Sequence, residues 1–363
     1  MVVKFTIVDI GKSLMRNYGI DLYRIVLTFL ICLLHTLNQG GVLSLYGRGT
    51  SHYALFWLLE VTCYCAVDGY ALISGYNARK KELNYSKLIQ MWFQVVFYSF
   101  VLTLILRIVK LDTETDLGVF ILSLIPVSSC EYWYFSAYFP LAILSPFIVK
   151  GLDKVEDDDL KKIFVFIVLT FTFSGLLYDC YVIAKGYSFV WLTLLYVLGY
   201  IIKRLNMFVK WSSIKLLLCS VLMVFTTWST LMILDNVKLI SYISPTILFN
   251  AIFLLILFSR FKLEKIKPLI KYIAPATFGI YLFQNNRVVW NKMKNAFLFV
   301  NNLGIFKAVA CTLCIALAIF ILGLIVERVR IRIFKLLRIE KLSSYLNEKI
   351  LKIINVLSLL LFN

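Results

Sequence analysis

Long apolar runs alternate with short polar segments along almost the whole chain. A run of about 20 apolar residues is long enough for a helix to cross the hydrocarbon core of a membrane. The pattern predicts ten such spans, at 19–38, 53–76, 88–109, 132–150, 161–179, 187–203, 213–235, 240–259, 272–291 and 303–327. The sequence therefore predicts an all-α fold, a polytopic bundle of transmembrane helices.

Composition and charge agree with this pattern and also predict how the chain is oriented across the membrane. The chain is 61% hydrophobic with a net charge of +18, and its mean hydropathy is +0.85. Of its 38 Lys and Arg residues, 28 fall in the segments on one side of the predicted spans and nine on the other. Because basic residues collect on the cytoplasmic side, we expect both termini to be cytoplasmic. The charges are scattered through short loops, so we expect no nucleic-acid partner.

The polar segments also bound the domain organisation. No polar stretch is long enough to fold alone, so residues 1–330 are expected to form one transmembrane domain. Residues 331–363 alternate basic and apolar side chains, which is typical of an amphipathic helix on the cytoplasmic surface of the bilayer. A frayed tail is the alternative.

The first apolar run contains two polar residues that need an explanation, Arg24 and His35. Buried polar side chains are costly in a membrane and often mark a functional pathway. Eleven positions are close to three helical turns, so both residues share one stripe and lie roughly 16 Å apart along the axis. His35 is either a general base or a histidine that a backbone carbonyl satisfies.

Two carboxylates in the second run match these residues in depth. Glu60 lies level with His35, and Asp68 lies level with Arg24, because span one runs outward and span two runs inward. We expect Glu60 to fix the His35 tautomer and Asp68 to pair with Arg24. Arg24 could equally bind a phosphate or carbonyl of a cofactor.

Several weaker signals surround these four residues. Ser74 precedes Gly75 at the end of span two, where a ligand could approach the backbone closely. Trp133 and its neighbours predict an interfacial aromatic belt or a sugar-binding rim. A Pro-Ala-Thr-Phe-Gly segment at 275–279 interrupts span nine and predicts an unwound, cavity-lining stretch. Cys311 and Cys314 lack an accompanying histidine or second CxxC, so no metal site is expected.

Together these pieces resemble the acyltransferase-3 family of integral-membrane O-acyltransferases. The segments that carry the resemblance are Arg24 with His35, Val67–Tyr76, Trp133–Tyr138 followed by Leu144–Phe147, and Thr277–Leu282. The style of the match is closest to members that acetylate bacterial surface polysaccharides. The resemblance implies acetyl-CoA as donor, a glycan or lipid-linked sugar as acceptor, and a location in the bacterial cytoplasmic (inner) membrane.

The resemblance also implies roles for individual residues. His35 matches the family's essential histidine and Arg24 its paired arginine, whereas Trp133 and Tyr138 match aromatic residues tied to activity. We therefore expect catalytic roles for His35 and Glu60, donor-binding roles for Arg24, Asp68 and Ser74, and acceptor-binding roles for Trp133, Tyr138, Tyr281 and Gln284.

One departure and two competing functions stay open. Many relatives carry His-Asp-Asn where this chain has Gln284-Asn285-Asn286, so a second titratable group is missing. A transporter or flippase for lipid-linked saccharides would also suit ten spans with a broken helix, although the sequence shows no inverted repeat. A glycan polymerase is less favoured because the predicted outer loops are short.

Overall fold

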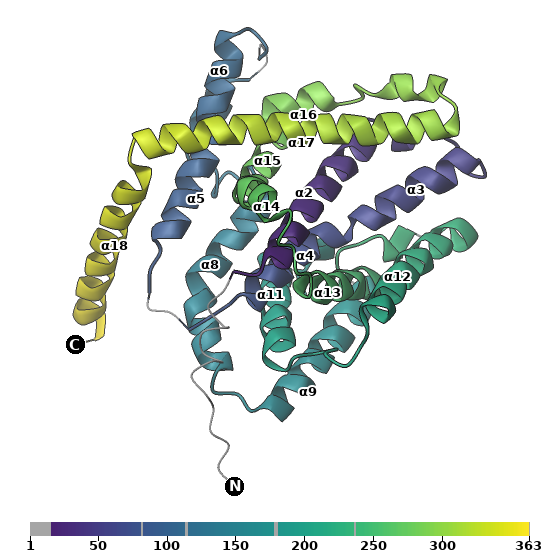
Figure 1. Cartoon of the computed structure of the whole chain (residues 1–363). Coiled ribbons are helices and arrows are strands. Elements are labelled where there is room, and N and C mark those ends of the chain that lie inside the picture. The colour runs from purple at the N-terminus through teal and green to yellow at the C-terminus, as the bar shows by residue number, and fades with distance from the viewer. Residues whose placement is uncertain (1–15, 81–82, 113–114, 178–180, 236, 363) are drawn as a thin grey trace.

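The computed structural model describes residues 16–80, 83–112, 115–177, 181–235 and 237–362, and within these ranges the regular structure is entirely helical. The α-helices are α2 (Tyr18–Asn38), α3 (Ser51–Cys63), α4 (Cys65–Tyr76), α5 (Ser86–Val96), α6 (Leu102–Ile108), α7 (Leu117–Leu122), α8 (Trp133–Leu152), α9 (Asp157–Ile167), α10 (Gly175–Leu177), α11 (Phe189–Arg204), α12 (Ser213–Leu234), α13 (Pro245–Ser259), α14 (Lys267–Ile273), α15 (Thr277–Gln284), α16 (Arg287–Met293), α17 (Ile305–Leu336) and α18 (Ile339–Phe362). Figure 1 shows their arrangement.

The all-helical membrane fold is confirmed. Seven helical stretches in the described part of the chain are long and apolar enough to cross a membrane: Tyr18–Leu45, Ser51–Tyr76, Ser86–Ile108, Trp133–Leu152, Asp157–Leu177, Ser213–Leu234 and Ile305–Leu336. The other three predicted spans correspond to the shorter helices α11 and α13 and to the interrupted segment α14–α16. The count of ten and the side of the termini stay predictions.

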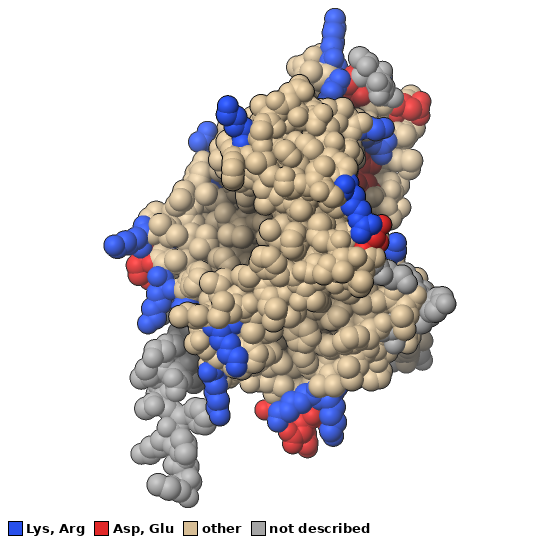
Figure 2. All heavy atoms as spheres, turned by 90° about the vertical axis from the view of Figure 1, so that its right-hand side faces the viewer, with Lys and Arg blue, Asp and Glu red and all other residues tan. Residues whose placement is uncertain are grey.

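The outer surface is suited to lipid. Helices α12 and α17 expose rows of apolar side chains, among them Leu218, Leu222, Leu322 and Ile325. Figure 2 shows a face on which uncharged residues dominate and the few Lys, Arg, Asp and Glu side chains gather toward its outline. An apolar surface of this extent on a soluble protein would aggregate, whereas hydrocarbon accommodates it.

Local sequence signals set where several helices begin. The side chains of Asn17, Thr50, Ser188 and Ser212 accept hydrogen bonds from backbone amides in the first turns of α2, α3, α11 and α12. Such caps satisfy N–H groups that have no partner inside the helix.

Helix α2 runs through the middle of the molecule, in contact with α3, α4, α13, α15 and α17 (Figure 1). Behind it, α4 and α11 cross so closely that a methyl group at Gly75 would overlap the carbonyl of Tyr196, and one at Gly199 would overlap that of Leu72. Small residues at a crossing let two backbones approach, as is common in membrane bundles. This packing holds α4 against α2.

Two of the predicted spans are broken. Span two is divided at Tyr64, where α3 ends and α4 begins. Span nine is interrupted by a 3-10 turn at Ala274–Ala276, as its Pro-Gly segment predicted, and again at Asn285–Asn286 before α16.

The predicted tail is helical. Helix α17 continues without a break to Leu336, past the expected boundary at residue 330, and α18 follows it. Asn347, in the first half of α18, accepts a hydrogen bond through Oδ1 from the backbone amide of Tyr85, 2.8 Å away. Helix α18 also lies along α5 (Figure 1).

Candidate active site

His35 lines a cavity of about 50 Å³. The other residues that line it are Ile31, Leu34, Val67, Tyr70, Trp133, Tyr134, Tyr242, Thr277, Phe278 and Tyr281. They come from α2, α4, the start of α8, the segment before α13, and α15. The predicted residues His35, Trp133 and Tyr281 are thus brought together in one largely aromatic cavity.

The His35 ring is held from the side by Trp290, whose ring it meets edge-on at a centroid distance of 4.8 Å. Its Nδ1 is buried and has no hydrogen-bond partner in the described chain. Gln284 lies beside the ring and is fully buried. Neither polar atom of the Gln284 amide is bonded to any described residue. His35 therefore has an amide neighbour with unused hydrogen-bonding capacity.

The predicted pairing of His35 with Glu60 is not formed. Glu60 Oε1 instead accepts a hydrogen bond of 2.5 Å from Asn38 Nδ2, and the carboxylate lines a separate cavity. Asn38 lies three positions after His35 on α2, about one turn further along, and takes the contact with Glu60 that the depth match assigned to His35.

Arg24 lines a second, larger cavity of about 890 Å³. Its described lining includes the basic side chains of Lys87, Arg330, Lys335, Arg338 and Lys341 and a single acid, Glu340. Arg24 Nη1 lies 2.9 Å from Asp21 Oδ1, and about a third of the Arg24 side chain is exposed. This cavity combines guanidinium and ammonium groups in the manner of a site for phosphates.

The predicted Arg24–Asp68 pair is also wrong. Asp68 is fully buried and its Oδ1 accepts a hydrogen bond of 3.1 Å from Trp191 Nε1. Arg24 instead pairs with Asp21, which lies one turn earlier on the same helix. The Asp21 partner follows from i,i+3 spacing on a helix, whereas nothing in the sequence indicates Trp191.

A layer of polar and aromatic side chains separates the two cavities. Tyr70 lines the His35 cavity, and its hydroxyl contacts Thr28 and donates to the carbonyl of Arg24 at 2.9 Å. The rings of Tyr134 and Tyr138 stack at 6.3 Å. Tyr138 lies close to Ser74 and to the Arg24 charge rather than to His35. Tyr138 and Ser74 thus belong to the layer between the cavities.

A buried charge network supports the basic cavity. Glu327 is fully buried and pairs with Arg330, while Tyr98 and Gln94 donate to its two oxygens at 2.8 Å and 3.1 Å. Such a network fixes the Arg330 guanidinium, because every partner is satisfied. The sequence did not single out Arg330, which looked like one more basic residue after the last span.

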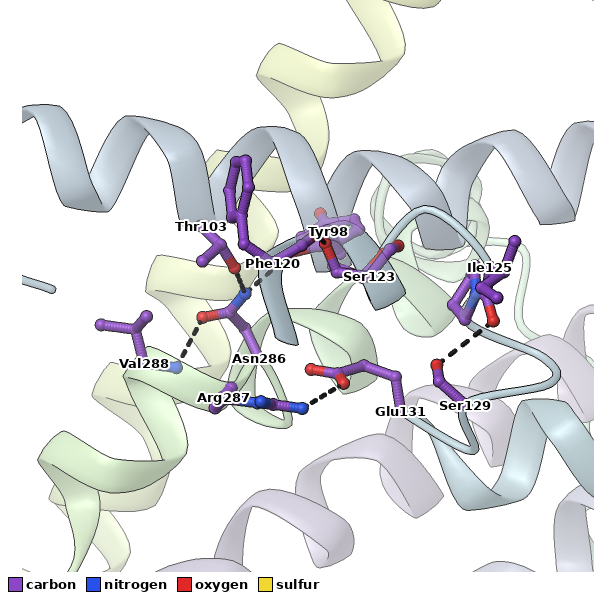
Figure 3. Close-up of polar contacts among 12 residues, drawn as sticks. Tyr98, Thr103, Phe120, Ser123, Ile125, Ser129, Glu131, Asn286, Arg287 and Val288 are labelled. Carbon is purple, nitrogen blue, oxygen red and sulfur yellow. Dashed lines mark hydrogen bonds and ion pairs between the residues drawn. The ribbon is translucent and has the colours of Figure 1, made fainter. Parts of the chain in front are cut away.

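A second polar cluster anchors the break after α15. Asn286 Nδ2 donates to the Tyr98 carbonyl and to Thr103 Oγ1, and Arg287 pairs with Glu131 at 2.6 Å (Figure 3). Glu131 lies two residues before Trp133, so this ion pair ties the end of span nine to the segment that carries Trp133. These contacts position the aromatic wall of the His35 cavity.

The fold and site define a polytopic membrane protein in which one central helix presents a partly buried imidazole to one cavity and an arginine to a second, basic cavity. No curated protein and no solved structure gives a significant match. The profile of the acyltransferase domain, however, matches residues 17–328. The chain therefore belongs to the acyltransferase-3 family and is a membrane acyltransferase.

Proposed function

We propose that the protein transfers an acetyl group from cytoplasmic acetyl-CoA to a hydroxyl of a bacterial cell-surface or lipid-linked polysaccharide. One observation carries the proposal: α2 presents His35 to one cavity and Arg24 to another. A candidate base and an anion-binding side chain thus lie on one helix, roughly 16 Å apart along its axis.

The basic cavity suits the donor. Its volume of about 890 Å³ is typical of sites for ligands of nucleotide size. The phosphates of CoA would find Arg24, Arg330, Arg338 and Lys87 there, and the loop charges favour the cytoplasmic side for this end of α2. The thioester would have to extend from this cavity past Tyr70 toward His35.

The His35 cavity suits the transfer step. A hydroxyl is a weak nucleophile at neutral pH, so a base must accept its proton as it attacks the thioester carbonyl. His35 Nε2 would accept that proton as the new C–O bond forms and the C–S bond breaks, and would return it to the departing thiolate. With a small rotation, the Gln284 amide oxygen would accept a hydrogen bond from Nδ1–H and hold the tautomer that leaves Nε2 basic.

The remaining residues take supporting parts in this proposal. Trp133 and Tyr281 would contact the acceptor at the His35 cavity. Ser74 and Tyr138 would line the passage for the thioester, and Asp68 would hold Trp191 and the α4–α11 contact rather than touch the donor. Glu60 has no place at His35.

The test is transfer of radiolabelled acetyl groups by the purified protein in proteoliposomes, with alkali-treated, de-O-acetylated surface polysaccharide of the native cells as acceptor. We expect His35→Ala to lower transfer by about 10²–10⁴-fold, the range for loss of a general base. His52→Ala is the matched control, because this histidine stacks on Tyr46 and lines neither cavity. Near-normal transfer by His35→Ala would contradict the mechanism, and a flippase would leave all label on acetyl-CoA.

A further inference from the structure

A third cavity adjoins the His35 cavity, at the end of α2 that the loop charges place outside. Its volume is about 480 Å³, and its lining includes Asn38, Trp57, Glu60, Tyr64, Lys185 and Ser241. This volume falls in the usual range for small-molecule sites. The proposed function as stated above leaves this cavity without a role.

Glu60 is the unusual residue of this cavity. Its side chain is 1% exposed, and only Oε1 is bonded, to Asn38. Oε2 is buried without a partner among the residues described, and so is the indole N–H of Trp57. Buried polar atoms are normally satisfied, since leaving one unpaired is costly. An unsatisfied carboxylate that lines a cavity indicates a ligand that donates hydrogen bonds.

The lining matches a sugar better than a cation. Carboxylate and amide groups bind hydroxyls, and the flat faces of Trp57 and Tyr64 can cover the C–H surface of a sugar ring. A metal ion would need several acidic or nitrogen ligands. In the described part of the chain, no group of three His, Cys, Asp or Glu residues is arranged so that it could hold a metal ion.

The sizes of the two cavities favour different occupants, with the sugar ring in the outer cavity and the reacting hydroxyl in the His35 cavity. The His35 cavity, at about 50 Å³, is much smaller than the outer cavity of about 480 Å³. The outer cavity is large enough for a sugar ring. The two adjoin, because the rings of Tyr64 and Tyr242 lie 5.3 Å apart and Tyr242 also lines the His35 cavity.

We infer that the cavity of Asn38, Trp57, Glu60 and Tyr64 is an acceptor subsite that binds a sugar ring of the polysaccharide through its hydroxyls. The inference rests on the proposed function. Glu60 accepts hydrogen bonds from two hydroxyls of the bound ring, while Trp57 donates to a third oxygen. Only the reacting hydroxyl of the adjoining sugar then enters the His35 cavity.

The experiment measures kinetic constants of Glu60→Gln and Trp57→Phe in proteoliposomes, with the de-O-acetylated polysaccharide as acceptor. Glu60→Gln keeps the shape of the side chain but replaces one carboxyl oxygen with an amide NH2, and Trp57→Phe keeps an aromatic face but removes the indole N–H. We expect Glu60→Gln to raise the acceptor KM about tenfold, because one oxygen that accepts from a sugar hydroxyl is replaced by a donor. Trp57→Phe should raise it several-fold, and kcat and the KM for acetyl-CoA should stay near wild type in both.

Trp228→Phe is the control, because the Trp228 indole donates to the Ala54 carbonyl at 2.7 Å and does not line the cavity. An unchanged acceptor KM for both cavity variants, or a loss confined to kcat, would overturn the inference while leaving the acyltransferase proposal intact. Wild-type protein that leaves the polysaccharide unlabelled would instead defeat the proposed function itself.

Discussion

An amide beside a catalytic imidazole acts differently from a carboxylate. Gln284 can hold the His35 ring through one hydrogen bond, but it brings no negative charge to stabilise the imidazolium that the proposed transfer would form. The uncharged neighbour also avoids placing a second unpaired ion in a site that is already buried. Orientation, rather than charge, is therefore the contribution we expect from Gln284.

Gln284→Leu tests this contribution. The substitution keeps most of the side-chain volume but removes both polar atoms, so the His35 ring can adopt either tautomer. We expect kcat to fall about tenfold, the effect of one lost hydrogen bond, with both KM values nearly unchanged. Asn285→Leu is the control, since Asn285 donates to the Tyr281 carbonyl instead. A Gln284→Leu enzyme with unaltered kcat would remove Gln284 from the mechanism.

Arg24 is expected to act on donor binding. Its guanidinium lines the basic cavity, and lysine cannot reproduce its planar, two-pronged contact with a phosphate. Arg24→Lys should raise the KM for acetyl-CoA about tenfold and leave the acceptor KM unchanged, as measured by initial rates. Arg16→Lys is the matched control, because Arg16 also pairs with Asp21 but does not line the cavity. A change in kcat alone would contradict the assignment.

The sequence identified some of the site residues but did not identify their partners correctly. Arg24 and His35 were found because polar side chains in an apolar run need a reason to be there. The partners of Glu60 and Asp68 were predicted wrongly, because depth along a span fixes one coordinate and not the direction around the bundle. Glu60 bonds to Asn38 and Asp68 bonds to Trp191 instead.

At the scale of elements, the α4–α11 crossing leaves no room for a larger side chain, because backbone atoms of the two helices are in direct contact. A methyl group on Gly199 would meet backbone atoms of Leu72 and Tyr76 rather than flexible side chains. Gly199→Ala should therefore lower stability by about 1–3 kcal/mol, as overpacking does, and lower the thermal midpoint in detergent. Gly151→Ala, where no described atom lies within 4 Å of the new carbon, should leave it unchanged or slightly higher. Equal thermal midpoints for Gly199→Ala and Gly151→Ala would show that α4 and α11 can move apart to accommodate the methyl group.

The helices could be predicted because local sequence patterns mark them, whereas the α4–α11 crossing could not be predicted because it depends on residues far apart in the sequence. Apolar runs mark each long helix, and the Pro-Gly segment marked the interruption of span nine. The close approach of two glycines depends on residues more than 120 positions apart, and no local pattern encodes it. The Arg287–Glu131 pair, which ties α16 to the start of α8, belongs to the same category.

At the scale of the whole molecule, three cavities follow α2 from one end to the other. The basic cavity lies at Arg24, the small aromatic cavity at His35, and the proposed acceptor cavity near Asn38. A highly charged donor cannot cross the aromatic layer around Tyr70 and Tyr134, whereas a thioester arm with little charge can. The arrangement therefore favours reactants that approach from opposite sides of the membrane.

Sealed vesicles of known orientation test this two-sided access. In inside-out vesicles, acetyl-CoA in the medium should label polysaccharide trapped in the lumen, because the basic cavity then faces the medium. In right-side-out vesicles, the same addition should give little label until detergent opens the membrane and restores the rate. The dependence follows from the 28 basic residues predicted on the cytoplasmic side, so reversed behaviour would show that the orientation is inverted. Equal rates in both orientations without detergent would mean that donor and acceptor enter from one side, and the path along α2 would have to be abandoned.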